Sequence, residues 1–135
     1  MPTIEILGSG RIDNRDSAFP STVQLPNGDI LCSFSVGDGP NVGGGTDIAR
    51  STDNGQTWTV EGTILPATNS PATSNSLKLS LSLDGATIYA YGARSYKDPD
   101  APKPRDRVIC RSTDGGRTWS PPHIVPMPTE DMPGV

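Results

Sequence analysis

Apolar and polar residues alternate along most of the chain, which predicts β-strands. The alternation is clearest in Leu77–Leu83, where every second residue is leucine. No stretch keeps an apolar period typical of a helix over three turns. Tight-turn sequences such as Asn27-Gly28 and Asp84-Gly85 separate the short runs. The predicted strands are Phe19–Leu25, Ile30–Val36, Thr46–Arg50, Trp58–Leu65, Leu77–Leu83, Thr87–Ala93, Arg107–Arg111 and Trp119–Val125.

The strands fall into two successive groups of four, each with the same order of turns and loops. The first-turn glycines Gly28 and Gly85 are 85 − 28 = 57 residues apart, and Asp53 and Asp114 in the third turns are 114 − 53 = 61 residues apart. A repeat of this length indicates a recurring supersecondary unit. Each group therefore predicts one four-stranded antiparallel meander, and the fold class is all-β.

The third turn of each group carries the same octad. Ser51–Trp58 reads S-T-D-N-G-Q-T-W, and Ser112–Trp119 reads S-T-D-G-G-R-T-W, identical at six of eight positions. The aspartates can accept bonds from backbone N–H groups ahead, and the glycines allow positive φ. The tryptophans offer large rings to bury. We interpret the octads as scaffold rather than chemistry, with structural roles for Ser51, Asp53, Gly55, Thr57, Trp58, Ser112, Asp114, Gly116, Thr118 and Trp119.

The shared pattern S-x-D-x-G-x-T-W resembles the Asp-box, or BNR repeat, of sialidases and related glycan-processing β-propellers. The resemblance covers roughly residues 17–125. It implies blades of a six-bladed sialidase-like propeller, of which about two are present. It implies fold more strongly than activity, since Asp-boxes also occur in non-catalytic propellers and in sorting receptors.

The expected organisation is one incomplete propeller domain. Residues 1–17 form an N-terminal edge strand (Thr3–Leu7) and loop, 18–66 blade one, 67–126 blade two, and 127–135 the lead-in to a third blade. Two blades cannot close a ring and leave sheet faces uncovered. We therefore expect the N-terminal part of a longer propeller protein. Self-assembly of a complete protein into a ring, or a compact two-sheet sandwich, are the alternatives.

Composition narrows the class of partner. The net charge of −4 and pI near 4.7 give no electrostatic basis for binding nucleic acid or an anionic membrane. No apolar run approaches the roughly 18 residues of a membrane span. The start of the chain lacks a signal-peptide pattern, so the expected location is cytoplasmic unless the N-terminus is truncated.

Cys32 and Cys110 are expected to be buried thiols, with a disulfide between blades as the alternative. His123 is the only histidine, and neither metal nor cofactor is expected.

The two ends of the meanders differ in chemistry. All four tight turns, the octads included, share one end, while the other end collects long polar loops. Functional groups concentrate on loops that a rigid scaffold positions, so we expect the site at the end away from the octads. These loops are Gly8–Ser17, Gly37–Gly45, Pro66–Asn75, Arg94–Asp106 and Pro126–Val135.

The resemblance also suggests site residues. Sialidases start their first inner strand with Arg-Ile-Pro, and Ala18 stands here where that carboxylate-binding arginine is expected, before Phe19-Pro20. Asp38 and Asp47 are the candidates for the catalytic acid/base on the second loop of blade one. Candidate substrate-binding residues are Arg15, Asp16 and Arg94. Arginines with carboxylates suit an acidic sugar.

The leading hypothesis is part of a sialidase-like glycoside hydrolase relative acting on acidic glycans, inactive as this stretch alone. The alternative is a non-catalytic glycan-binding or adhesion propeller, and a purely structural repeat is a third possibility. The expected partners are a glycan and the remaining propeller blades.

Overall fold

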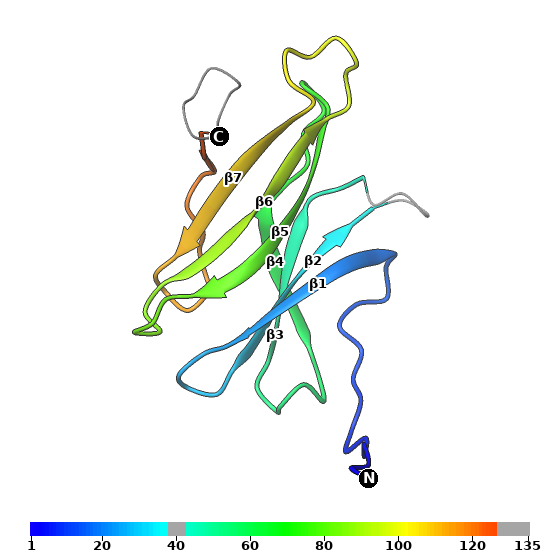
Figure 1. The fold of residues 1–135 in the computed structure, drawn as a ribbon, viewed down its shortest axis with the longest axis vertical. Helices are drawn as coiled ribbons and strands as arrows, with labels where there is room; N and C mark the ends of the chain where they lie inside the picture. Colours follow the sequence, from blue (N-terminus) through cyan, green and yellow to red (C-terminus); the bar gives the residue numbers. More distant parts are fainter. Residues whose placement is uncertain (38–42, 127–135) are drawn as a thin grey trace.

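The computed structural model describes residues 1–37 and 43–126, and shows two four-stranded antiparallel sheets (Figure 1). Each sheet is a meander in which strands adjacent in sequence pair with one another. This confirms the predicted all-β fold and its two blades. The strands of blade one are β1 (Ser17–Gln24), β2 (Ile30–Val36), β3 (Thr46–Ser51) and β4 (Thr59–Leu65). Those of blade two are β5 (Thr73–Leu81), β6 (Ile88–Tyr96), β7 (Arg105–Ser112) and β8 (His123–Ile124).

Strand ends differ from the prediction in blade two. The hairpin of β5 and β6 is longer than expected, because Thr73 pairs with Tyr96. By contrast, β8 keeps only His123–Ile124 of the predicted Trp119–Val125. Pro121 and Pro122 precede it and have no N–H to donate to a ladder, which explains the late start.

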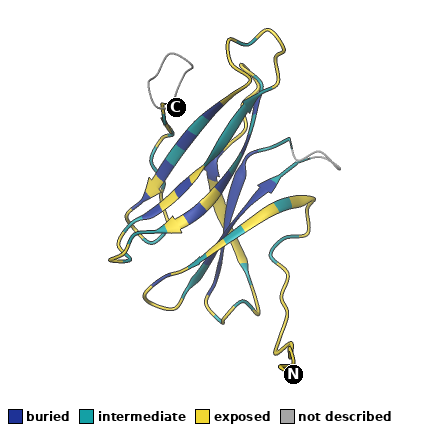
Figure 2. Ribbon diagram, in the orientation of Figure 1, coloured by how far each residue is buried: buried dark blue, intermediate teal, exposed yellow. Residues whose placement is uncertain are grey.

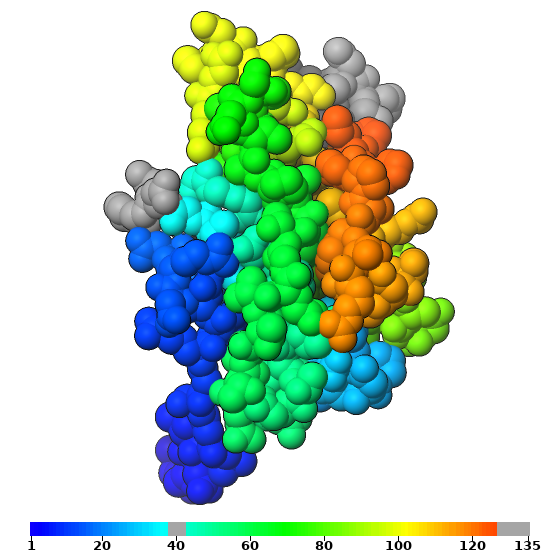
Figure 3. Space-filling view, turned by 180° about the vertical axis from the view of Figure 1, so that it is seen from behind, coloured from blue at the N-terminus to red at the C-terminus, as the bar shows by residue number. Residues whose placement is uncertain are grey.

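The predicted N-terminal edge strand does not form. Thr3–Leu7 carries no strand, and its large apolar side chains Ile4, Ile6 and Leu7 are exposed. A strand needs a neighbour for its backbone N–H and C=O groups, and no described strand pairs with this segment. The first residues instead project beyond blade one (Figure 3).

The main core lies between the two blades. Leu31 and Ile48 from blade one meet Leu77, Ile88 and other apolar residues of blade two in one buried cluster. A smaller cluster on the opposite face of blade one contains buried side chains that the N-terminal segment and the first octad help to cover: Cys32, Phe34 and Ala49, with Ile12, Val36 and Trp58 against them. Burial in blade one is concentrated in β2 and β3, and every residue of β3 is buried, whereas β1 is largely exposed (Figure 2).

Blade one also covers the free edge of β5. The Ser33 hydroxyl donates to the carbonyl of Leu77 at 2.8 Å, and the Leu77 N–H donates to Thr46 Oγ1 at 3.1 Å. The Leu79 N–H donates to Ser21 Oγ at 3.0 Å. An edge strand normally exposes such groups. Here short hydroxyl side chains satisfy them, so the blades are joined by polar contacts as well as by the core.

Candidate functional site

The first octad is a closed hydrogen-bonded turn, as predicted. The Asp53 carboxylate accepts bonds from the Thr57 N–H at 2.8 Å, the Thr57 hydroxyl at 2.5 Å and the Ser51 hydroxyl at 2.8 Å. The Gly55 N–H donates to Ser51 Oγ, and Gly55 has a φ of 87°. The hydroxyl and N–H of Thr57 together lower the pKa of Asp53 to about 2. The hydrogen bonds of the Asp53 carboxylate are thus formed within its own turn.

The second octad repeats this network. Asp114 accepts from the Thr118 hydroxyl and N–H and from the Ser112 hydroxyl, while the Gly116 N–H donates to Ser112 Oγ. The bonds from Thr118 hold the pKa of Asp114 far below its usual range. The ring of Trp119 packs on the core between the blades, whereas Trp58 packs on the smaller cluster. Both octads therefore act as scaffold, as their sequence predicted.

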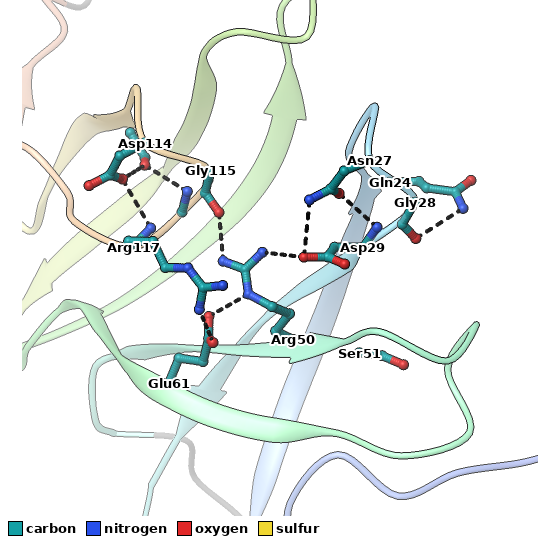
Figure 4. Close-up of polar contacts among 12 residues, drawn as sticks. Gln24, Asn27, Gly28, Asp29, Arg50, Ser51, Glu61, Asp114, Gly115 and Arg117 are labelled. Carbon is teal, nitrogen blue, oxygen red and sulfur yellow. Dashed lines mark hydrogen bonds and ion pairs between the residues drawn. The ribbon is translucent and has the colours of Figure 1, made fainter.

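A charged cluster at the octad end was not predicted. The side chain of Arg50, only 5% exposed, forms ion pairs with Asp29 at 3.0 Å and with Glu61 at 2.8 Å. It also donates to the Gly115 carbonyl of the second octad at 2.6 Å (Figure 4). Arg117 pairs with the other oxygen of Glu61. We call Arg50, Asp29, Glu61 and Arg117 the inter-blade clasp. The only sequence signal for it is that Arg precedes both octads, at Arg50 and Arg111.

The long loops meet at the opposite end, as predicted for the described loops. The Lys97 ammonium donates to the Gly43 carbonyl at 2.8 Å, and the Asn75 N–H donates to the Gly44 carbonyl at 3.0 Å. One segment departs from the prediction. Gly10 lies against the first octad, since a Cβ there would come within 2.4 Å of the Gly55 carbonyl oxygen. The Gly8–Ser17 segment therefore begins at the octad end, and only its later residues reach the long loops.

Arg15 and Asp47 come together at the long-loop end. Arg15 Nη2 lies 2.8 Å from Asp47 Oδ2, and Arg15 Nε donates to Asp13 at 2.7 Å. The other oxygen of Asp47 accepts from the Thr63 hydroxyl at 2.7 Å. Asp47 is buried in β3, while the side chain of Arg15 is 50% exposed. The hydrogen bond to Asp47 raises the pKa of Arg15, which stays a cation held between two carboxylates.

Asp16 does not join this cluster. Asp16 is exposed, and its backbone carbonyl accepts from the Gly37 N–H. Asp38 lies outside the described residues. Their proposed roles therefore remain predictions from the sequence.

A second cluster forms around Arg94 on blade two. Asp106 Oδ2 accepts from Arg94 Nη2 at 3.0 Å and from the Tyr96 hydroxyl at 2.5 Å. The Arg94 guanidinium carbon lies 5.8 Å from the centre of the Tyr96 ring, within reach of a cation–π contact. The bonds from Tyr96 and Arg94 lower the pKa of buried Asp106 and keep it a carboxylate. No hydrogen bond or ion pair of the described residues links this cluster to Arg15.

Two cavities open beside these clusters. One of about 260 Å³ is lined by Ala18 together with Asp13, Phe34 and five other residues: Gly10, Arg11, Ile12, Ser17 and Pro20. The other, of about 270 Å³, adjoins Asp106 and Tyr96. Ala18, the position where the arginine was expected, thus lines the same cavity as Asp13, which binds Arg15.

Cys32 and Cys110 are buried and not bonded to each other, as expected. Burial raises the pKa of both thiols. Within residues 1–37 and 43–126, no group of three or more His, Cys, Asp or Glu side chains is arranged to hold a metal ion. The same residues contain no helix with the length and apolar character to cross a membrane.

Comparison with known proteins agrees with this geometry. The BNR/Asp-box repeat family matches residues 49–60 and 111–121, one match on each octad. Each of the two sheets thus carries one BNR/Asp-box repeat and has the four-stranded antiparallel architecture of a β-propeller blade. Among solved structures it is similar to a Penicillium chrysogenum alpha-L-arabinanase complexed with arabinobiose, with 26% identity and a TM-score of 0.56. The match covers 77% of this chain and 30% of the arabinanase. No curated protein matches the chain.

Proposed function

We propose that this chain forms part of a propeller that acts on glycans, with the ligand bound at the long-loop end. The contrast between the two ends carries the proposal. At the octad end, carboxylates such as Asp53 are held by their own turns. At the other end, Arg15 binds Asp13, which lines one cavity, and Asp106 lines the other. Similarity to an arabinanase complexed with a disaccharide supports a sugar as the ligand.

The more specific proposal is a glycoside hydrolase relative of the sialidase type acting on acidic glycans. Half-exposed Arg15 is positioned by Asp13 and Asp47, which occupy its Nε and Nη2, and its Nη1 would donate to a sugar carboxylate. Asp47, or Asp38, would protonate the leaving oxygen. Arg94 and Asp16 would contribute further contacts. Ala18 cannot contribute the charge of the arginine expected there, so carboxylate binding would depend on Arg15.

A non-catalytic glycan-binding propeller is the second candidate, and the environment of Asp47 favours it. Both carboxylate oxygens of Asp47 accept hydrogen bonds, one from Arg15 and one from Thr63. A general acid must bring a proton to the leaving oxygen, so Asp47 would first have to release one of these partners. As a partner of Arg15, it instead positions the guanidinium, a role suited to binding.

Binding of the 135-residue chain to a saccharide panel tests these proposals. The panel contains arabinobiose, a sialoside and a uronate disaccharide, and calorimetry measures affinity while chromatography measures cleavage. We expect at least one saccharide to bind, and Arg15→Ala to weaken binding while Arg111→Ala, at the octad end, does not. Preference for the acidic sugars supports the sialidase-type proposal. Weaker binding by Asp47→Asn than by wild type supports the non-catalytic candidate, in which Asp47 positions Arg15, and cleavage by the wild type would contradict it. Failure of every saccharide to bind would contradict the glycan proposal itself.

A further inference from the structure

The cavity beside Asp106 has the size and walls of a sugar-binding pocket. It measures about 270 Å³ and lies between the loop after β6 and the outer strand β8. Figure 3 shows that loop, in yellow, next to the last described residues, in orange-red, at one end of the molecule. The lining residues are Tyr96, Ala101, Pro102, Lys103, Asp106 and Ile124. None of them belongs to the cluster around Arg15.

The polar wall offers an acceptor that is fixed in place. Oδ2 of Asp106 accepts from both Arg94 and Tyr96. Oδ1 accepts no hydrogen bond from the described part of the chain. Oδ1 is not one of the buried unpaired side-chain atoms of the described residues, so it is accessible and is suited to accept from a ligand hydroxyl. A sugar carboxylate has no proton to donate to it and would be repelled, which favours an uncharged sugar.

The remaining walls suit the other features of a sugar ring. Ala101, Pro102 and Ile124 form an apolar surface, and Ile124 is 55% exposed in spite of its size. The C–H face of a sugar can cover such a surface and remove it from water. Exposed Lys103 carries three N–H donors for ring or hydroxyl oxygens. A few polar groups converging on an apolar wall is the usual composition of a ligand pocket.

We propose that this pocket binds one uncharged sugar unit of a glycan, with its hydroxyls on Asp106 and Lys103 and its C–H face on Pro102 and Ile124. It would be a subsite on blade two, separate from the cluster of Arg15 and Asp47. The inference depends on the proposed glycan function and adds a place and a sugar class to it. It also assigns Asp106 a role in ligand binding and gives Arg94 a positioning role.

Backbone amide chemical shifts of the full chain, titrated with arabinobiose as the probe, test the pocket. We expect shifts at Tyr96, Lys103 and Ile124. Ile124→Trp should fill the pocket and weaken binding about tenfold or more, the equivalent of losing roughly one hydrogen-bonded contact. Val60→Trp is the matched control, because Val60 is a partly exposed aliphatic residue on the outer strand β4 of blade one. It should bind like the wild type.

Lys103→Glu provides a second variant on an exposed loop position, where loss of the fold is not expected. It replaces a donor with an acceptor next to Asp106 and should also weaken binding, while dispersed amide spectra verify folding. If arabinobiose binds wild type and both variants equally, the pocket is wrong and the glycan proposal stands. If only the acidic saccharides bind, the assignment to an uncharged sugar is wrong. If no saccharide binds the wild type, both proposals fail.

Discussion

The corresponding sheet faces of the two blades differ in burial. Leu31 and Arg50 pair across β2 and β3 of blade one, and Tyr89 and Arg111 hold the same register positions in blade two. Leu31 and Arg50 are buried by the neighbouring blade. Tyr89 remains 37% exposed and Arg111 is exposed. The repeat thus sets the position of each side chain, while the neighbouring blade decides whether it is buried.

Arg50 belongs to the clasp because blade one places two carboxylates beside it. Arg50 has Asp29, just before β2, and Glu61, three residues after Trp58, as its carboxylate partners. The corresponding positions in blade two are Thr87, just before β6, and Pro122, three residues after Trp119. Arg111 therefore lacks acidic partners in its own blade. Burial of a guanidinium requires paired charges, and only blade one provides them.

Removal of the two arginines should give the largest contrast between the blades. Arg50→Ala leaves the carboxylates of Asp29 and Glu61 without their shared cation and should lower the free energy of unfolding by about 3–5 kcal/mol. Arg111→Ala should change it by less than about 0.5 kcal/mol. Urea denaturation of both variants measures the difference. Equal effects would show that the clasp does not distinguish the two faces.

Truncation of the two tryptophans should give a smaller contrast. Both rings are partly buried, so each substitution to Ala should cost about 2–3 kcal/mol, below the value for a fully buried ring. Trp119→Ala should cost more than Trp58→Ala, because Trp119 packs on the core between the blades. Thermal unfolding of the two variants ranks them, and the reverse order would contradict this difference in packing.

The hydroxyls at the inner edge of β5 should matter less individually. Ser33→Ala leaves the buried Leu77 carbonyl without the donor that lies 2.8 Å away, and should cost about 1–2 kcal/mol. Ser80→Ala, at an exposed position of β5, is the control and should have almost no effect. Chemical denaturation compares the pair. No loss in Ser33→Ala would mean that solvent satisfies this carbonyl.

The octads should produce the smallest effect, which is present at neutral pH and lost in acid. The pKa of Asp53 is lowered from 3.8 to about 2 in the folded chain, so its stabilising contribution is complete above pH 4 and disappears as pH falls toward 2. Asp53→Asn should flatten part of the melting temperature profile between these values. Asp114→Asn serves as the comparison, and its effect should extend to lower pH. A profile unchanged in both variants would argue against the hydrogen bonds that Thr57 and Thr118 donate to these aspartates.

Local patterns predicted most of the fold. β2 has the bounds that alternation and the flanking turns indicated, Ile30–Val36, and both octads form the expected turns. The errors have local causes too, such as Pro121 and Pro122 shortening β8. The clasp could not be found in this way, because Arg50 meets Gly115 at a separation of 65 residues. The partnership of Arg15 with Asp47 spans 32 residues and likewise has no local signal.

β5 is an edge strand, but hydroxyl groups of blade one satisfy backbone groups along its free edge, as a neighbouring strand would. Its N–H groups at Leu77 and Leu79 are bonded to side chains of the other sheet, although no described strand pairs with β5 on that side. Deuterium should therefore enter these amides as slowly as it enters a central strand, and only when the blades separate. Exchange at these two positions would thus report separation of the interface between the blades rather than fraying of a single sheet.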